Sequence, residues 1–517
     1  MAFFLSVLLV GLATLLVGAL VKYYGTLWLY YPPGPIPLPI IGNFHQMNFN
    51  DLIGSLAAFA QQYGPVFTLH FPQRMVVITD YDVMRDALVK NGDAFVNRPQ
   101  TPLVGAVNGG FHGIAVACGA RWREQRRFAL HTLRDFGLGR AELEPRIFEC
   151  CEQLLRELET ASSTCAAYNP VEALELTTAN VINTLLVGKT FVGDVDKFRE
   201  LKQRLDEMFE GIVRPATRLV IALPLLRFVP LFGHFGIEQQ QRSTERFLEY
   251  FRDDVDEKMR LLAAGAEPTD YVGVFLRQWA IEDAKGSSHY FSMSQLLHSL
   301  MDLWMAGMET TVTTLRWSLL ILVQHRHIQQ RIRDEIHATI GSERFATMAD
   351  QKSLPYTVAA ISELQRASNI GSINLFRETT RDVAVGRYRL PRGTVVLPQT
   401  PNVFWDEKWF PEARRFEPSR YLTDGAEEKL PSAFFGMGKR ECPGKSLARA
   451  ELFLILTTVL QRFELTPEPG RALPTDKDVC NGLTRKPGHY RVMVKRVTAS
   501  GEQRLVTLKN GVKRVHA

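Results

Sequence analysis

The stretch FFGMGKRECPG at 434–444 directly precedes a strongly apolar helical run from Lys445 to Phe463. Its glycines predict a tight loop. Pro443 suits the first position of a helix, which places the sulfur of Cys442 at a helix N-terminus. There the helix dipole, unpaired N–H groups and the nearby Arg440 favour the thiolate over the thiol. A merely buried or reactive free cysteine would leave the glycines and the apolar helix unexplained, so we expect Cys442 to bind a metal.

Composition limits the classes of protein that this chain can belong to. It has 517 residues, of which 46% are hydrophobic and 22% charged, so a disordered, collagenous or multi-span membrane protein is excluded. The net charge of +6 is not gathered into basic runs, and we expect no nucleic-acid partner. The six cysteines form no CxxC pair, which argues against structural zinc and a disulfide framework and favours a reducing compartment.

The N-terminus predicts a membrane anchor followed by a hinge. Residues 3–21 are uninterrupted apolar or small residues, about enough to cross a bilayer as a helix. Lys22 follows this run and no basic residue precedes it. This pattern favours an uncleaved anchor at 1–22, with the bulk of the chain on the cytosolic side. A cleaved signal peptide is the alternative. Residues 23–45 contain PPGPIP and read as a proline-rich hinge.

The remaining residues, 46–517, predict a single large domain that is mainly α with small β-sheets. No repeat, linker or low-complexity segment divides it. Strand signals lie at 66–69, 75–78, 388–397 and 489–494. The longest predicted helix starts after Ser292, whose spacing to Gln295 fits a capping box, and runs to about Gln324.

The middle of that long helix, AGMETT at 306–311, contradicts helix preferences. Glycine and threonine are poor helix formers, and Glu309 is costly to bury. Such violations often mark function. From this helix alone, a functional notch and a small-residue packing notch with Glu309 bonded internally are equally supported.

Four motifs together resemble one family. The pattern FxxGxRxCxG at 435–444 resembles the haem-binding signature of the cytochrome P-450 superfamily, in which cysteine is the proximal haem ligand. AGxET at 306–310 resembles its oxygen-binding motif, ExxR at 363–366 its conserved helix pair, and WxxxR at 122–126 its propionate-contacting helix. The anchor and hinge resemble the large animal microsomal group of that superfamily. The likeness covers essentially the whole chain.

The resemblance implies haem b, iron protoporphyrin IX, with Cys442 as the axial ligand to iron. It also implies that Glu309 and Thr310 form an acid and alcohol pair for proton delivery, and that Ala306 and Gly307 leave room for substrate. The residues that it assigns to haem contact or to the haem propionates are Phe435, Arg440, Trp122, Arg126, Arg98 and Arg377.

A structural network is implied for Glu363, Arg366 and Arg420. Glu363 and Arg366 lie three residues apart, hence on one face of a helix, where they can pair. The later segment departs from the family pattern at Ser419 and Tyr421, but Arg420, which would complete the network, is present.

The implied activity is insertion of one oxygen atom of O2 into a lipophilic small molecule, whether xenobiotic, fatty acid or steroid-like. NADPH electrons would arrive through NADPH-cytochrome P-450 reductase, with cytochrome b5 as a second candidate donor, at the endoplasmic reticulum membrane. We expect a basic docking face or, alternatively, a solvated charged surface, at Arg121, Arg123, Arg127, Lys439 and Lys445. The implied substrate pocket draws on mostly apolar segments at 101–117, 201–212, 304–310, 370–375 and 479–483.

Two other functions stay open at this stage. One is a haem-thiolate isomerase or dehydratase that works without a reductase, although such relatives tend to lack the acid and alcohol pair. The other is a non-catalytic haem protein that senses a ligand, which would leave that pair without a role.

Overall fold

The computed structural model describes residues 2–497, apart from 40, 72, 102–103, 106–107, 138–140, 287, 424, 426–429 and 483. The end of the predicted 46–517 domain, parts of the predicted substrate segment 101–117 and Leu483 therefore lie outside the described residues.

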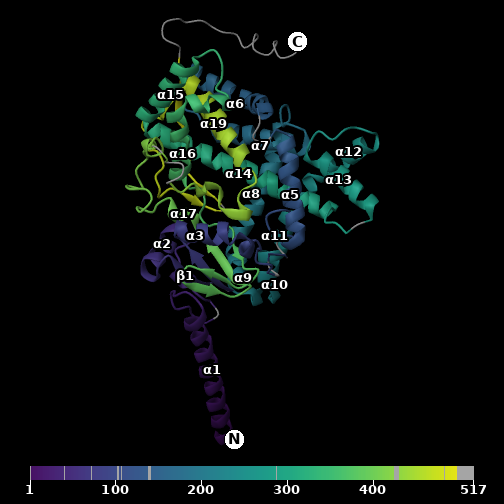
Figure 1. The fold of residues 1–517 in the computed structure, drawn as a ribbon, viewed down its shortest axis with the longest axis vertical. Coiled ribbons are helices and arrows are strands. Elements are labelled where there is room, and N and C mark those ends of the chain that lie inside the picture. Colours follow the sequence, from purple (N-terminus) through teal and green to yellow (C-terminus); the bar gives the residue numbers. More distant parts are fainter. Residues whose placement is uncertain are drawn as a thin grey trace.

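Helix α1 (Ala2–Tyr30) projects from one end of the molecule (Figure 1). It continues eight residues beyond the predicted end of the anchor at 22, because no proline interrupts the chain before Pro32. Residues 31–39 contain no helix, as the prolines predict. Across the described residues, no helix combines the length and the apolar character that crossing a membrane requires, so the predicted membrane helix is not confirmed.

The domain that follows the proline-rich hinge is mainly helical, as predicted. Its long central helix α14 (Met293–Gln324) is surrounded by other helices, while the sheet that contains β1 (Val66–Phe71) lies toward the end that carries α1 (Figure 1). The other α-helices are α2 (Leu52–Tyr63), α3 (Tyr81–Arg85), α5 (Gly119–Asp135), α6 (Glu144–Thr164), α7 (Val171–Val187), α8 (Val195–Val213), α9 (Pro215–Ala222), α10 (Pro230–Gly233), α11 (Gln239–Tyr250), α12 (Arg252–Ala263), α13 (Tyr271–Lys285), α15 (Arg326–Ile340), α16 (Pro355–Ser368), α17 (Thr400–Val403) and α19 (Lys445–Arg462).

The strands form one mixed sheet and three two-stranded sheets, in agreement with the prediction of small sheets. The larger sheet has the order β1-β2-β6-β3, with β2 antiparallel to β1 and parallel to β6. The small sheets pair β7 with β10, β4 with β5, and β8 with β9. The strands are β1 (Val66–Phe71), β2 (Gln73–Ile78), β3 (Arg377–Glu378), β4 (Val383–Val385), β5 (Tyr388–Leu390), β6 (Val395–Pro398), β7 (Phe463–Pro467), β8 (Cys480–Asn481), β9 (Arg485–Lys486) and β10 (Val492–Arg496).

Helix α14 begins where the sequence predicts. The Ser292 side chain accepts a hydrogen bond from the Gln295 N–H at 3.2 Å, which caps the helix. The Gln295 side chain does not return to Ser292; its amide donates to the Gly113 carbonyl at 2.9 Å. The predicted N-cap is confirmed, and the other half of the capping box instead holds the loop before α5 against α14.

The core is built around α14, α7 and α19. Most of α14 is buried, and so is most of α19. The two helices share one cluster of buried apolar side chains that also includes residues of α6 and α7. Burial of apolar surface on this scale is the main driving force for folding and holds α14 rigid across the domain.

Candidate active site

The cysteine loop is closed by the backbone and fixed by glycine. The Cys442 N–H donates to the Phe435 carbonyl at 2.9 Å, so Phe435 positions the loop. Gly436 and Gly438 have φ angles of +74° and +71°. A Cβ at Gly438 would lie 1.9 Å from the Leu88 carbonyl oxygen. Only glycine fits there, and the loop is thereby held against the segment at 86–90.

The local chemistry of Cys442 differs from the prediction in two respects. Helix α19 begins at Lys445 with Gly444 as N-cap, two residues after Pro443, so the sulfur lies further from the helix N-terminus than predicted. Burial raises the pKa of the Cys442 thiol, although the Gly444 N–H and Arg126 act in the opposite direction. The arginine that favours the thiolate is Arg126 on α5 rather than the predicted Arg440. A bound cation such as iron would supply the missing stabilisation.

Four arginines from distant parts of the chain lie near this loop. They are Arg98 before α5, Arg126 on α5, Arg377 on β3 and Arg440 in the loop. Burial, together with the charges of the other three, lowers the pKa of Arg377 to about 8. Within the described part of the chain, no carboxylate forms an ion pair with any of the four. Such a concentration of buried positive charge requires an anionic partner.

The hydrogen bonds of these arginines set Arg377 apart from the other three. Arg98 and Arg440 donate to backbone carbonyls, Arg98 to Ala115 at 3.1 Å and Arg440 to Val96 at 2.7 Å, so they hold the loop before α5 in place. Arg126 donates to the Glu441 carbonyl. The Arg377 Nη1 atom, by contrast, is buried without a partner among the described residues.

Trp122, like Arg377, has a buried N–H group that lacks a hydrogen-bond partner in the described structure. Its ring lies 4.0 Å from the Arg440 guanidinium carbon, and its Nε1 atom is buried with no partner in the described ranges. Buried donors are rarely left unsatisfied in a native protein. The orphaned N–H groups, the unpaired arginines and the cysteine fit a metal-bearing ligand with carboxylate groups, and haem with its two propionates is such a ligand.

On α14 the accessible face coincides with the motif identified in the sequence. Ala306 is exposed although it lies in the middle of an otherwise buried helix. The Thr310 hydroxyl donates to the Ala306 carbonyl at 2.7 Å. Gly307 fits the packing alternative left open by the sequence, because a Cβ there would lie 3.0 Å from Ile182 of α7. Close packing of α7 on α14 accounts for this glycine.

Glu309 is buried and points to the C-terminal hairpin. Its Oε1 atom lies 2.6 Å from Lys486 Nζ and accepts a hydrogen bond from the Thr484 hydroxyl at 3.1 Å. Neither Lys486 nor Thr484 was identified from the sequence. The available signal was the pair of basic residues Arg485 and Lys486 shortly after the substrate segment at 479–483.

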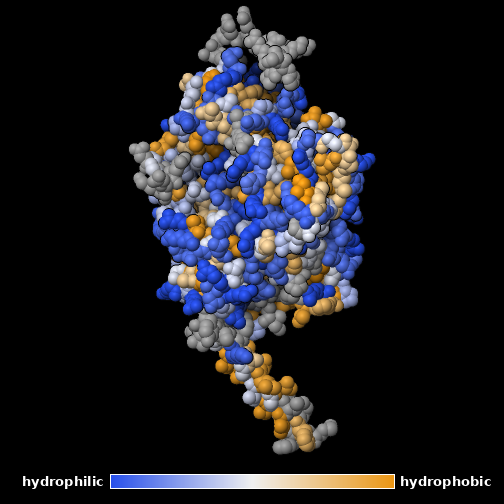
Figure 2. Space-filling view, turned by 45° about the vertical axis from the view of Figure 1, so that its right-hand side comes forward, coloured by the Kyte–Doolittle hydropathy of each residue, from blue (hydrophilic) through white to orange (hydrophobic). Residues whose placement is uncertain are grey.

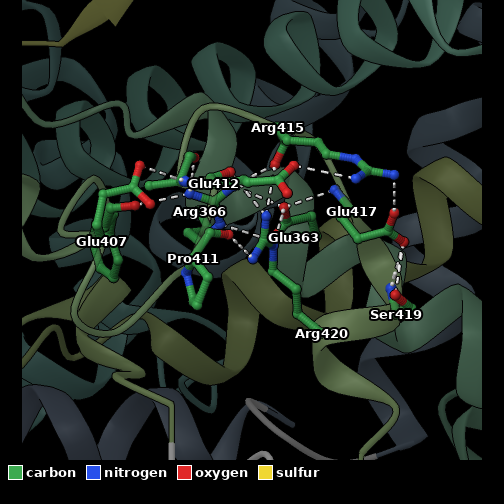
Figure 3. A network of polar contacts seen from close by, with 11 residues as sticks. Glu363, Arg366, Glu407, Pro411, Glu412, Arg415, Glu417, Ser419 and Arg420 are labelled. Atoms are coloured by element: carbon green, nitrogen blue, oxygen red, sulfur yellow. Dashed lines mark hydrogen bonds and ion pairs between the residues drawn. The ribbon is translucent and has the colours of Figure 1, made fainter.

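The predicted network around Glu363 forms as expected (Figure 3). Both Glu363 oxygens accept from Arg366, at 2.7 and 2.8 Å, and the pair is fully buried. Arg366 also donates to the carbonyls of Phe404 and Ala413. Arg420 completes the network at 3.4 Å from Glu363. The departure at Ser419 does not disturb it, because the Ser419 hydroxyl donates to Glu417 at 2.8 Å.

A basic groove of about 680 Å³ lies along α5. Arg123 and Arg127, both predicted, are exposed in it, and Arg134 lines it as well. Lys439 lines it but is paired with Asp93, and Lys445 is paired with Glu441 at 2.7 Å. Arg121 is turned inward onto the Phe111 carbonyl. The groove also includes Trp122 and Arg126, so it reaches the arginine cluster.

Two exposed apolar side chains lie at the end of the predicted substrate segment 370–375, Leu375 within it and Phe376 directly after it. Leu375 is 55% and Phe376 38% exposed, and the adjacent backbone carbonyls accept hydrogen bonds from Arg98. Exposed apolar side chains beside a polar cluster are typical of the wall of a ligand site.

Comparison with known proteins agrees with this geometry. The family model for Cytochrome P450 matches residues 32–494. Cytochrome P450 2H2 of Gallus gallus is 36% identical over 447 residues, which cover 85% of this chain and 88% of that protein. Cytochrome P450 2C5 of Oryctolagus cuniculus is 36% identical over 470 residues, covering 89% and 93%. The chain therefore belongs to the cytochrome P450 family, and the protein is a P450 monooxygenase, an oxidoreductase.

Proposed function

We propose that the protein inserts one oxygen atom of O2 into a lipophilic small molecule, with NADPH electrons delivered by NADPH-cytochrome P-450 reductase and haem bound through Cys442. The net reaction consumes substrate, O2, two electrons and two protons and yields the hydroxylated product and water. The observation that carries this proposal is the convergence of Cys442, the accessible face of α14 and four arginines, three of them buried, that form no ion pair with a carboxylate in the described structure.

Haem, when bound, would supply the reductive activation of O2, a reaction that thiolate ligation favours. Cys442 would bind the iron. Trp122 and Arg377, whose buried N–H groups lack partners in the described structure, would hold the propionates with Arg126. Arg98 and Arg440 would support haem binding indirectly, because their hydrogen bonds to backbone carbonyls fix the loop before α5.

Thr310 and Glu309, both on α14, would take part in proton delivery. Because the Thr310 hydrogen is donated to the Ala306 carbonyl, the hydroxyl oxygen is left as an acceptor for a water molecule. Glu309 would supply protons to that water as a general acid. Ala306, Leu375 and Phe376 would contact the lipophilic substrate. Other residues of the pocket would select among xenobiotics, fatty acids and steroids.

The basic groove supports docking of an acidic electron donor, either the reductase or cytochrome b5. Arg123, Arg127 and Arg134 form no ion pair within the described structure. Their unpaired charges lie beside Trp122 and Arg126, which would bring an electron donor close to the cofactor.

We also propose attachment to the endoplasmic reticulum membrane through α1, as a single pass with the domain on the cytosolic side. Exposed apolar side chains on α1 support attachment, for example Leu15 and Leu16. α1 stands out as an apolar projection (Figure 2). A second exposed apolar set lies in the α9–α10 region, at the same end of the molecule (Figure 1), and comprises Leu219, Leu225, Phe228, Val229 and Leu231.

The test is the absorption spectrum of the reduced protein with CO, for the wild type and Cys442→Ser, followed by O2 consumption with NADPH and purified reductase. We expect a strongly red-shifted Soret band that the substitution abolishes, and reductase-dependent O2 uptake. A histidine-like CO spectrum would overturn the ligand assignment. A thiolate spectrum with no O2 uptake would favour a ligand sensor, and peroxide rearrangement without reductase would favour an isomerase.

A further inference from the structure

The contact between Glu309 and Lys486 joins the central helix to the C-terminal hairpin. Glu309 is 3% exposed, and the Lys486 side chain is 28% exposed, so a buried carboxylate meets a partly hydrated ammonium group. The Thr484 hydroxyl donates to the same carboxylate oxygen. Thr484 also lies 3.4 Å from the Thr313 hydroxyl, one turn further along α14.

The orientation of Glu309 is set by this hairpin and not by its neighbour Thr310. Consecutive residues of a helix project in directions about 100° apart, so they do not face each other. The Thr310 hydroxyl is bonded back along α14, whereas the Glu309 carboxylate is bonded to β9. The hairpin therefore determines where the Glu309 carboxylate lies relative to Thr310.

The hairpin that carries Lys486 is itself firmly attached. The Arg485 side chain donates to the carbonyls of Ser368 and Asn369, at 3.0 and 3.2 Å. The Arg485 carbonyl accepts from Trp317 of α14 at 2.7 Å, and its N–H donates to the Ile370 carbonyl at 2.8 Å. Lys486 is therefore presented from a rigid element, which is what precise positioning requires.

Other charges near Glu309 are already paired with each other. Lys202 of α8 lies 2.5 Å from Asp206 and 3.5 Å from Glu175 of α7. In the described structure, Lys486 supplies the ion pair of Glu309. Loss of one partner from a buried ion pair leaves an uncompensated charge and is strongly unfavourable.

We propose that Lys486 is a positioning residue for oxygen insertion: it holds the Glu309 carboxylate at a fixed position relative to Thr310, so that proton delivery depends on the docked β8–β9 hairpin. This inference rests on the proposed function. Lys486 is not consumed, because each proton that Glu309 passes on is replaced from solvent.

The experiment compares Lys486→Met and Lys486→Arg in the full-length holoenzyme with reductase. Lys495→Met, on the neighbouring strand β10, is the control because it makes the same change at an exposed lysine. The probe substrates are lauric acid, testosterone and 7-ethoxycoumarin, and the readouts are product and peroxide formed per NADPH, kcat and KM.

We expect Lys486→Met to lower kcat and the product formed per NADPH by about tenfold, with a matching rise in peroxide and KM changed by less than about twofold. Lys486→Arg should restore most of the coupling, because it keeps the charge. Lys495→Met should behave as the wild type. Wild-type coupling in Lys486→Met would overturn the inference.

A double-mutant cycle reports the ion pair independently of activity. Glu309→Gln, Lys486→Met and the double variant are unfolded thermally as holoproteins. We expect the double variant to have a higher Tm than Lys486→Met alone, because it no longer buries an unpaired carboxylate. Additive effects would overturn the inference. If the wild type itself gives no reductase-dependent product, the proposed function fails, while the cycle still tests the contact.

Discussion

Two groups of buried arginines in this molecule differ in what neutralises them. Arg366 is held by both oxygens of Glu363 and by backbone carbonyls, so its charge is compensated within the protein (Figure 3). Arg377 lies among Arg98, Arg126 and Arg440 and keeps a buried N–H group without a partner in the described structure. The first group is complete as folded and stabilises the fold, whereas the second is completed only by an anionic ligand.

The largest effect expected from this comparison is the loss of Glu363. Glu363→Ala leaves Arg366 fully buried and unpaired, which should lower the free energy of unfolding by about 3–5 kcal/mol and reduce the yield of folded protein. Urea unfolding followed by circular dichroism measures it. Glu152→Ala, which breaks an exposed pair on α6, is the control and should cost under about 0.5 kcal/mol. Equal losses would show that burial of the network does not matter.

Glu451 is a third case to compare with the two arginine groups, because it is a buried acid that forms no ion pair in the described structure. Burial raises its pKa to about 8, although a bond from the Thr311 hydroxyl opposes the shift. The folded state therefore binds this proton more tightly than the unfolded state, and the associated stability falls as pH rises from about 4.5 through 8. Glu451→Gln should remove this fall, a difference of about 1–3 kcal/mol between pH 6 and pH 8 in unfolding experiments. An unchanged pH dependence would contradict the assignment.

Arg377→Leu tests the second arginine group. Removing one of four like charges should leave the free energy of unfolding of the haem-free protein unchanged or higher. The rate of haem loss should rise about tenfold, because one charge-assisted bond to a propionate is lost. Haem transfer to apomyoglobin measures the rate, and Arg381→Leu, at an exposed arginine nearby, is the control. A fall in stability without faster haem loss would show that Arg377 is structural.

Residues that act through local sequence were predictable. The start of α14 at Ser292, the cysteine loop with its glycines and the pairing of Glu363 with Arg366 all follow from spacing along one segment. The membrane helix, in contrast, stays a prediction.

Residues whose role depends on distant partners were not predictable. Lys486 meets Glu309 through a hairpin of two-residue strands, which leaves no periodic signal. The sequence indicated six residues for haem contact, but not that Arg98 and Arg440 donate to backbone carbonyls. For Gly307 the family resemblance implied room for substrate and the helix pattern left a packing notch open; its contact with Ile182, far away in the sequence, was not predictable.

The exposed arginines of the groove extend the comparison to charges that are neither buried nor paired. Arg127→Glu should raise the KM for reductase severalfold at low salt and leave kcat at saturating reductase unchanged, because an exposed charge steers association without altering the haem site. The effect should shrink as ionic strength rises. Lys352→Glu, an exposed site outside the groove, is the control for net charge. If both variants respond alike, the net charge of the protein and not the groove governs docking. A loss of kcat that excess reductase does not restore would place Arg127 in the haem site instead.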